Sequence, residues 1–230
     1  MRIISYNLRK HRAASELTRL VEDHGANLLC LQECDVAALP ERIANLKLAR
    51  ATAGNRLGLA LYHGASMFRA EKVMTWGLKK SLHDIVLRPA HERVLGVRLR
   101  DIDDGHEIVV GSFHAAPLTA LNSLRRSQIR AALTQLQSLG PDLPVLMVGD
   151  YNYPVFKESL GQTVRDHGYS LTLSDDHTYT RYRVFRGHYD FATSVGLTID
   201  RITTLPQGTS DHRPILVTAR VREAFAYERI

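Results

Sequence analysis

Apolar runs and one helical pattern alternate over the first part of the chain. The pattern predicts a strand over residues 3–7, a helix over 15–24 and a second apolar strand over 28–31. The helix is indicated by apolar residues that recur on one face and by Gly25, which ends it. The second strand leads into Gln32-Glu33. This order of elements predicts a βαβ unit.

The middle of the chain contains strand-like runs without clear helices between them. They lie at residues 57–62, 70–76, 94–99 and 108–113. Asp103-Asp104-Gly105 is typical of a hairpin turn and is expected to join the last two runs. This stretch therefore predicts an antiparallel portion of the fold.

A second alternation of strand and helix fills the remainder. Residues 121–139 predict a helix and residues 145–148 a short buried strand, followed by a shorter helix over 156–167 and strands over 189–194, 200–205 and 214–221. One strand in each half ends in Tyr-Asn, at Tyr6-Asn7 and at Tyr151-Asn152. Two halves of this kind predict a four-layer α/β/β/α sandwich of the α/β (α+β) class, with two mixed sheets face to face and helices outside. No linker divides residues 1–230, which we expect to form a single domain.

The amino-acid composition and the net charge place only weak limits on the localisation and the partners of the protein. Of the 230 residues, 44% are hydrophobic and 23% are charged, which is ordinary for a globular α/β protein. The apolar start at Ile3-Ile4 is too short for a secretory signal, so we expect a cytoplasmic protein. Cys30 and Cys34 are expected to be reduced structural thiols, because no further cysteine could pair with them. The formal net charge of +6 weakly favours anionic partners such as nucleic acid or phospholipid surfaces.

Candidate chemistry collects beside the ends of the predicted strands. Apolar runs are followed by Asn7, Glu33, His114, Asp150 and Asn152. Asp190 lies at the start of a predicted strand, and Asp211 and His212 lie just before the last one. Ligands of open α/β sheets bind at strand ends. Carboxylates and amides without thiolates suit hard cations such as Mg²⁺, Mn²⁺ or Ca²⁺, and two histidines supply groups that exchange protons near neutral pH. This inventory fits the attack of water on phosphorus.

Six segments in order resemble the motifs of the endonuclease/exonuclease/phosphatase superfamily. This superfamily includes pancreatic deoxyribonuclease, abasic-site endonucleases, sphingomyelinases and inositol-polyphosphate phosphatases. The segments span residues 5–214: Ser5-Tyr6-Asn7, Leu31-Gln32-Glu33, Ser112-Phe113-His114, Gly149-Asp150-Tyr151-Asn152, Tyr189-Asp190-Phe191 and Ser210-Asp211-His212-Arg213-Pro214. The resemblance implies a metal-dependent phosphoesterase with Mg²⁺ or Mn²⁺ as the cofactor.

The resemblance also implies a role for each residue on the metal side of the site. Glu33 would be the principal metal ligand, with Asn7 beside it, and Asp211 a further carboxylate on the metal side. His212 would be the general base or its equivalent. Asp190 would orient His212.

The remaining roles concern the water and the phosphate. By the same resemblance, Asp150 would orient the attacking water and Asn152 would hold a phosphate oxygen. His114 resembles the second histidine of the deoxyribonuclease and sphingomyelinase branches, where the abasic-site endonucleases carry a tyrosine. The deoxyribonuclease branch supports this histidine with a glutamate, but the closest position here holds Asn55-Arg56.

Two basic segments bear on the substrate. Arg9 and Arg12 lie in a cationic stretch directly after Asn7, and residues 179–188 interleave aromatic residues with Arg181, Arg183 and Arg186. Arginines that alternate with aromatics suit a phosphate backbone and stacked bases. The alternative for the second segment is a basic surface loop with half-buried aromatics.

Three functions are consistent with these observations. The leading hypothesis is a nuclease that hydrolyses phosphodiester bonds in nucleic acid. The second is a phosphatase or phosphodiesterase that acts on a phospholipid head group or a small phosphorylated metabolite, because the catalytic residues do not separate the two. The third is a catalytically silent binding module, against which the complete set of polar residues argues.

Overall fold

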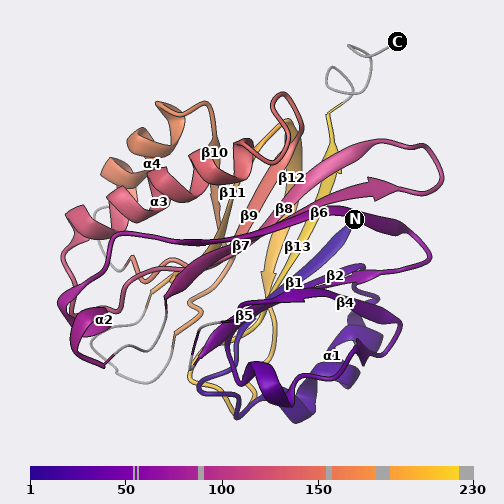
Figure 1. Cartoon of the computed structure of the whole chain (residues 1–230), viewed down its shortest axis with the longest axis horizontal. Helices are drawn as coiled ribbons and strands as arrows, with labels where there is room; N and C mark the ends of the chain where they lie inside the picture. Colours follow the sequence, from indigo (N-terminus) through magenta and orange to yellow (C-terminus); the bar gives the residue numbers. More distant parts are fainter. Residues whose placement is uncertain (54, 56, 88–90, 154–156, 180–186, 223–230) are drawn as a thin grey trace.

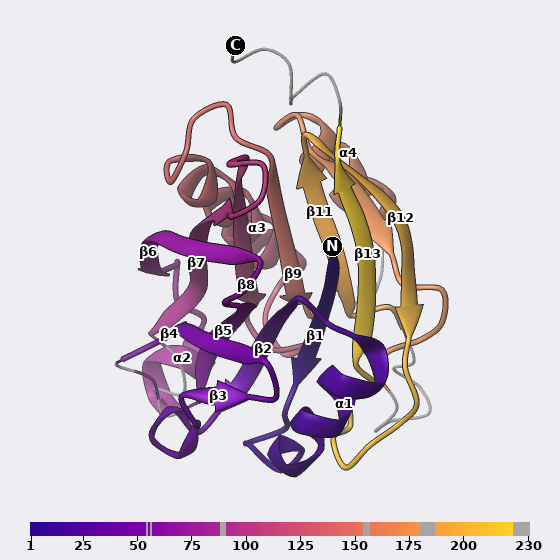
Figure 2. The ribbon, with the colours of Figure 1, turned by 90° about the vertical axis from the view of Figure 1, so that its right-hand side faces the viewer.

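Two β-sheets pack face to face, with helices on their outer faces (Figures 1 and 2). The computed structural model describes residues 1–53, 55, 57–87, 91–153, 157–179 and 187–222. The predicted four-layer sandwich of mixed sheets is confirmed.

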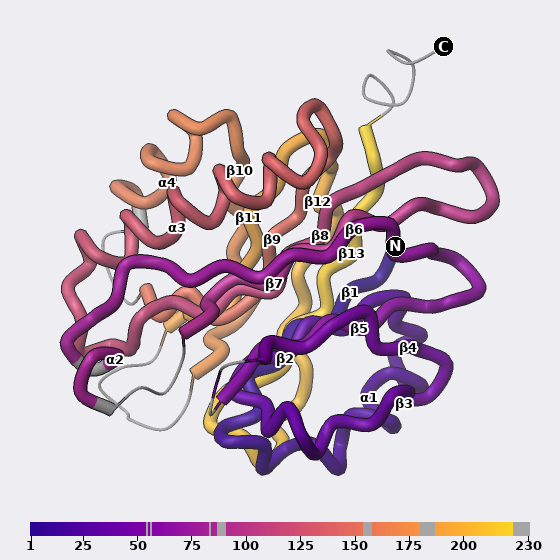
Figure 3. Tube along the Cα trace, viewed as in Figure 1, coloured from indigo at the N-terminus to yellow at the C-terminus, as the bar shows by residue number. Residues whose placement is uncertain are grey.

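The first sheet has seven strands. They are β1 (Arg2–Asn7), β2 (Leu28–Cys34), β3 (Arg42–Ile43), β4 (Leu46–Ala51), β5 (Gly58–Gly64), β12 (Leu197–Thr204) and β13 (Ile215–Val221). Their order is β12-β13-β1-β2-β5-β4-β3. The β1–β2 pair is parallel and the other pairs are antiparallel. The first and last strands of the chain, β1 and β13, thus lie side by side (Figure 3).

The second sheet has six strands. They are β6 (Phe68–Gly77), β7 (Glu92–Asp101), β8 (Glu107–His114), β9 (Val145–Asp150), β10 (Ser170–Leu173) and β11 (Asp190–Val195). Their order is β10-β11-β9-β8-β7-β6, with only β8 and β9 parallel. Each sheet therefore has one parallel pair near its middle.

The four helices in the described part of the chain are α1 (Leu17–His24), α2 (Leu82–Leu87), α3 (Asn122–Gln137) and α4 (Lys157–Arg165), with 3-10 turns at Ala14–Glu16 and Val36–Ala38. Three of them, α1, α3 and α4, cover the outer faces because their apolar sides pack on the sheets. One apolar cluster joins α1 to the first sheet, and another joins α3 and α4 to the second sheet. None of the helices in the described part of the chain has the length and hydropathy needed to cross a bilayer.

A third apolar layer lies between the two sheets. Ile3 and Val217 of the first sheet and Val110 and Leu146 of the second are fully buried in it. Because side chains alternate along each strand, the opposite faces of these strands supply the layers beneath the helices. This central layer fixes the two sheets against each other and so sets the relative position of their edges.

The sequence patterns located most elements and missed four. The hairpin between β7 and β8 is confirmed, and both cysteines are free and buried. The expectation of no helix in the middle region is wrong, since α2 lies between β6 and β7. Six residues are too few to show helical periodicity. The strands β3, β4 and β10 were also missed, because they are short or only partly buried.

Candidate active site

The central strands of the two sheets end close together. Asn7 is the last residue of β1, and Asp150 is the last residue of β9. The Nδ2 atom of Asn7 donates to Oδ2 of Asp150 at 3.0 Å, and both side chains are buried. Strand register brings His114 and Asp190 to the same edge, because each pairs with Asp150 on a neighbouring strand. Residues far apart in the sequence thus form one polar cluster.

The carboxylate of Asp150 is held by the chain that follows it. The main-chain N–H of Asn152 donates to Oδ1 at 2.9 Å, and its Nδ2 atom donates to Oδ2 at 3.2 Å. Asn152 is left-handed, with φ of 48°, which turns its side chain back toward the carboxylate. The preceding Gly149 has φ of 151°, and a Cβ atom there would lie 1.9 Å from the carbonyl oxygen of Phe113. Burial raises the pKa of the Asp150 carboxyl group.

Asp190 and His212 form a buried pair beside Asp150. The Nδ1 atom of His212 donates to Oδ2 of Asp190 at 2.8 Å, while its Nε2 atom lies 3.6 Å from Oδ2 of Asp150. Burial alone would lower the pKa of His212, but the carboxylates of Asp190 and Asp150 outweigh it and raise this pKa to about 10. The hydroxyl of Thr178 accepts the main-chain N–H of Asp190 at 3.0 Å. The free edge of the His212 ring therefore faces Asp150.

His114 approaches Asp150 from β8. Its Nε2 atom lies 3.6 Å from Oδ2 of Asp150. Burial lowers the pKa of His114 to about 4, and the attraction of Asp150 only partly opposes this. The two histidines beside Asp150 thus differ at neutral pH, because His114 is neutral and His212 is an imidazolium.

The main chain at His114 rests on a buried ion pair that was not predicted. Arg93 donates to the carbonyl oxygens of His114 at 2.9 Å and Ala115 at 2.7 Å, and its other terminal nitrogen pairs with Asp84. Arg93 is 3% exposed and Asp84 is 1% exposed. Asn55, the position aligned with the supporting glutamate, instead bonds the main chain at Glu92.

Two further carboxylates lie at this edge of the molecule. Glu33 directly follows Gln32, the β2 partner of Asn7, and its Oε2 atom accepts the main-chain N–H of Lys10 at 2.9 Å. Asp211 is 9% exposed and lies 3.6 Å from the guanidinium of Arg9. Both carboxylates thus lie beside the cationic stretch that follows β1.

The donor set fits a divalent cation. Glu33, Asp150, Asp190 and Asp211 provide four carboxylates, against the two positive charges of the His212 imidazolium and the Arg9 guanidinium. Ligand atoms of Asp150, Asp190 and His212 lie within 4.8 Å of one another, and Oδ1 of Asp190 is buried without a hydrogen-bond partner among the described residues. Carboxylate oxygens are the donors that hard cations prefer. A doubly charged cation would balance the surplus negative charge.

The chain beside Glu33 adopts a strained conformation. Arg9, Lys10 and His11 have φ of 46°, 56° and 68°, and Glu33 has φ of 54°. The left-handed region costs roughly 1–2 kcal/mol for each such residue. The amides freed by this turn donate to Oδ1 of Asn7 and to the side chain and main chain of Glu33. Strain of this kind persists where the surroundings enforce it, and it gathers at functional sites.

The structure describes only part of the predicted substrate-binding set. The side chain of Arg12 is exposed, while Arg181, Arg183 and Arg186 lie outside the described residues. Tyr179, at the start of that segment, is buried, and its ring centroid lies 4.9 Å from the His212 ring. Tyr179 therefore packs against the catalytic candidate instead of offering an open stacking surface.

Several residues outside the predicted site set support the site. Gln32 is fully buried, and its Nε2 atom bonds the hydroxyls of Ser5 at 3.3 Å and Ser112 at 3.0 Å, which links the two sheets. Ser210 donates to the carbonyl oxygen of Asn7 and accepts the main-chain N–H of His212. Gln32 and Ser210 lie inside the quoted motifs, so their positions carried a signal. Asp84 and Arg93 lie outside these motifs and carried none.

Comparisons with known proteins agree with this architecture. The sequence profile of the Endonuclease/Exonuclease/phosphatase family matches residues 4–222. No curated protein matches the chain.

Solved structures of this fold resemble the chain at low sequence identity. The endonuclease/exonuclease/phosphatase from Bacteroides vulgatus has a TM-score of 0.75 at 13% identity, covering 96% of this chain and 98% of its own. The mannosyl-6-phosphatase Bt3783 of Bacteroides thetaiotaomicron VPI-5482 has a TM-score of 0.76 at 14% identity, covering 96% and 99%. D. rerio TDP2 complexed with single strand DNA product has a TM-score of 0.73 at 14% identity, also covering 96% and 99%.

Proposed function

Because this chain belongs to the endonuclease/exonuclease/phosphatase family, whose members hydrolyse phosphoester bonds, we propose that it is a divalent-metal-dependent phosphodiesterase acting on nucleic acid. One observation carries the proposal. The pair of Asp190 and His212 lies against Asp150, which is bonded across the sandwich to Asn7. This geometry places a histidine held by one carboxylate and a second, oriented carboxylate at one point, which supports in-line attack by water.

We assign the metal to the side of the site that lies next to Arg9 and Lys10. Glu33 would be its principal ligand, with Asn7 beside it and Asp211 as a further carboxylate. When bound, the cation stabilises negative charge on the phosphate oxygens and lowers the pKa of nearby acids. Mg²⁺ and Mn²⁺ are the ions that we propose for this oxygen-rich set.

We assign proton transfer to the buried residues around Asp150. Asp190 holds Nδ1–H of His212, so that Nε2 can take a proton from the attacking water after the imidazolium has released its own Nε2 proton. Asp150 accepts a hydrogen bond from that water and fixes its direction. Asn152 and the neutral His114 donate to the phosphate oxygens, where charge accumulates during attack.

Nucleic acid is the first substrate class that we propose. The net charge of +6 favours a polyanion, and Arg9 lies at the edge of the cluster with Arg12 close by in the sequence. The structurally similar TDP2 binds a single-stranded DNA product, which is consistent with this choice. We propose Arg181, Arg183 and Arg186 as further phosphate contacts.

A phosphorylated lipid or metabolite is the second candidate. The similar Bt3783 is a mannosyl-6-phosphatase, so the fold accepts small phosphoesters. Within this chain, a groove between α2 and α3 is lined in part by aliphatic and cationic side chains. That combination suits an amphiphile better than it suits stacked bases.

The test is a hydrolysis panel with purified protein and Mg²⁺ or Mn²⁺. We expect nicking of plasmid or degradation of single-stranded oligonucleotides, and at least a hundredfold loss of rate in Glu33→Gln. The exposed Glu41 offers a matched control, and Glu41→Gln should retain full activity. Release of phosphate or of a phosphorylated head group, with nucleic acids left intact, would select the second candidate. Failure to cleave even a generic bis-aryl phosphodiester would contradict both.

A further inference from the structure

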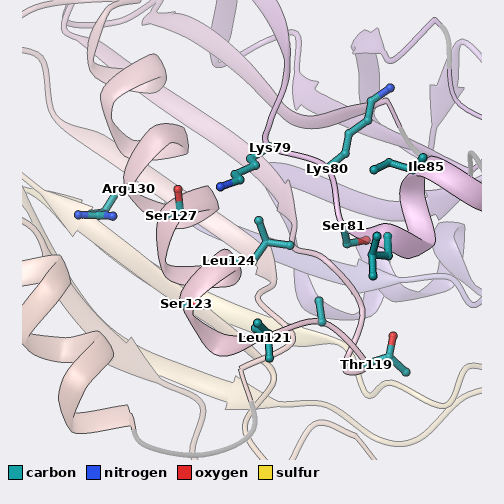
Figure 4. Close-up of a pocket in the computed structure, with 12 residues that line it drawn as sticks. Lys79, Lys80, Ser81, Ile85, Thr119, Leu121, Ser123, Leu124, Ser127 and Arg130 are labelled. Carbon is teal, nitrogen blue, oxygen red and sulfur yellow. The ribbon is translucent and has the colours of Figure 1, made fainter.

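A groove of about 700 Å³ lies between α2 and the first half of α3 (Figure 4). Among the described residues that line it, three are cationic, namely Lys79, Lys80 and Arg130, and none is acidic. Lys79 points toward α3, and Lys80 extends in the opposite direction beside Ile85 (Figure 4). All three cations are exposed, so the groove offers its positive charge to solvent.

Large aliphatic side chains project at the groove. Leu82 is 81% exposed and Ile85 57%, and Leu121 across the groove is 74% exposed. Val86, on the same short helix, is 76% exposed. These four are a majority of the seven large hydrophobic side chains that are exposed in the described part of the chain. A cluster of this kind is costly in water and marks an interaction surface.

The chemistry of the groove discriminates between two classes of polyanion. Single-stranded nucleic acids are held by aromatic rings on which bases stack, and none of the described residues that line the groove is aromatic. Aliphatic residues beside lysines are instead the combination that inserts into the acyl boundary of a bilayer while contacting anionic head groups. The only acidic residue of α2, Asp84, is turned inward and pairs with Arg93, so it does not oppose an anionic surface.

The groove is connected to the candidate active site by buried hydrogen bonds. Ser81 in the groove wall donates to Asp84 at 2.8 Å, Asp84 pairs with Arg93, and Arg93 donates to the carbonyl oxygen of His114. Gln128 of α3 donates to the carbonyl oxygen of Lys79 at 2.7 Å and accepts the N–H of Ala116, two residues after His114. A surface that engages the groove is thereby held at a fixed position relative to His114.

We propose that this face docks on an anionic phospholipid surface. Leu82, Ile85, Val86 and Leu121 enter the acyl boundary, and the three cations contact lipid phosphates. The docking itself needs no catalysis. Only its consequence, that the membrane presents phosphoesters to the active site, rests on the proposed phosphoesterase function.

Vesicle sedimentation tests the docking without turnover. The full chain is mixed, in the presence of EDTA, with vesicles of phosphatidylcholine alone or of phosphatidylcholine and phosphatidylglycerol at roughly three to one. We expect at least tenfold stronger binding to the anionic vesicles, weakened by added salt. The double variant Leu82→Ser/Val86→Ser should lose this binding at least tenfold, and Lys79→Gln/Lys80→Gln should lose it together with its salt dependence.

Matched controls carry the same substitutions away from the groove. Met74 is 43% exposed on β6, and Lys47 and Lys72 are exposed, so Met74→Ser and Lys47→Gln/Lys72→Gln should bind vesicles as the wild type does. Thermal unfolding establishes that each variant is folded. Equal loss in the controls, or no binding of the wild type to anionic vesicles, would overturn the proposal.

Two further outcomes separate this inference from the proposed function. If the groove variants bind single-stranded DNA more weakly but bind vesicles normally, the groove serves nucleic acid and the proposal fails. Hydrolysis of a soluble bis-aryl diester by a wild-type protein that does not bind vesicles overturns the docking and leaves the phosphoesterase intact. Vesicle binding by a wild-type protein that hydrolyses no phosphoester would support the docking and contradict the proposed phosphoesterase function.

Discussion

The pair of Asp190 and His212 makes a quantitative prediction possible. Asp190→Asn keeps the shape of the side chain and removes its charge. The raising of the His212 pKa from 6.5 to about 10 corresponds to roughly 5 kcal/mol, at about 1.4 kcal/mol for each pKa unit. Several carboxylates share this effect, and Asp190 contributes the largest part because it is both the main opposing charge and the hydrogen-bond partner. We therefore expect Asp190→Asn to lower the free energy of unfolding at pH 7 by about 3 kcal/mol, which is typical of a broken buried ion pair.

The raised pKa of His212 also predicts the direction in which stability changes with pH. Because the pKa of His212 is higher in the folded protein than in the unfolded chain, the stabilisation is fully present below pH 6.5 and is lost as the pH rises through about 10. Urea unfolding of the metal-free protein at pH 7 and at pH 10.5 measures this loss. Between pH 7 and pH 10.5, the free energy of unfolding of the wild type should fall by several kcal/mol more than that of Asp190→Asn. Subtracting the change measured for Asp190→Asn from the change measured for the wild type removes the contribution of other groups that titrate at high pH.

Two further measurements complete the experiment. In an NMR titration, the pKa of His212 should fall by at least two units in Asp190→Asn. Asp200→Asn is the control, because Asp200 forms an exposed ion pair with Arg220 and its loss should cost less than about 1 kcal/mol. A wild-type His212 that titrates near 6.5, or equal pH profiles for wild type and Asp190→Asn, would refute the reasoning.

Three other predictions follow from buried features of the site. Gly149→Ala should cost about 3 kcal/mol or more in urea unfolding, because its Cβ atom would collide with the main chain of Phe113. Arg93→Met should destabilise by about 3–5 kcal/mol by leaving Asp84 buried and unpaired, and Asp84→Leu added to it should restore part of the loss. His114, with its pKa lowered to about 4, should stay neutral in NMR titrations down to pH 5, and the protein should lose stability as the pH falls from 6.5 toward 4.

The sequence predicted the site mainly because strand ends can be read from apolar runs. The runs before Asn7, His114 and Asp150 are continuous, since these central strands are buried on both faces. Their ends therefore fall where hydrophobicity stops. Because ligands of α/β sheets bind at strand ends, these side chains could be expected to meet, although Asn7 lies in one sheet and His114 and Asp150 in the other.

The supporting structure could not be predicted in the same way. Arg93 and Asp84 meet where α2 lies beside the start of β7, and a six-residue helix leaves no periodic signal. The strand β4 was hidden because its register shifts between Leu48 and Arg50, which breaks the alternation of apolar and polar residues. Nothing in the composition of Arg9-Lys10-His11 indicates a left-handed turn, since no glycine marks it.

The hydrogen bond between Asn7 and Asp150 should make the rate of hydrolysis sensitive to the relative position of the two sheets. Each partner is placed by a different sheet, and their separation is fixed by the apolar layer between the sheets together with the hydrogen bonds of Gln32 to Ser5 and Ser112. A small loosening of that layer would break the bond while leaving every helix and strand in place. Far-ultraviolet circular dichroism would then report a folded chain whose chemistry had already stopped, so inactivation should precede unfolding on mild heating.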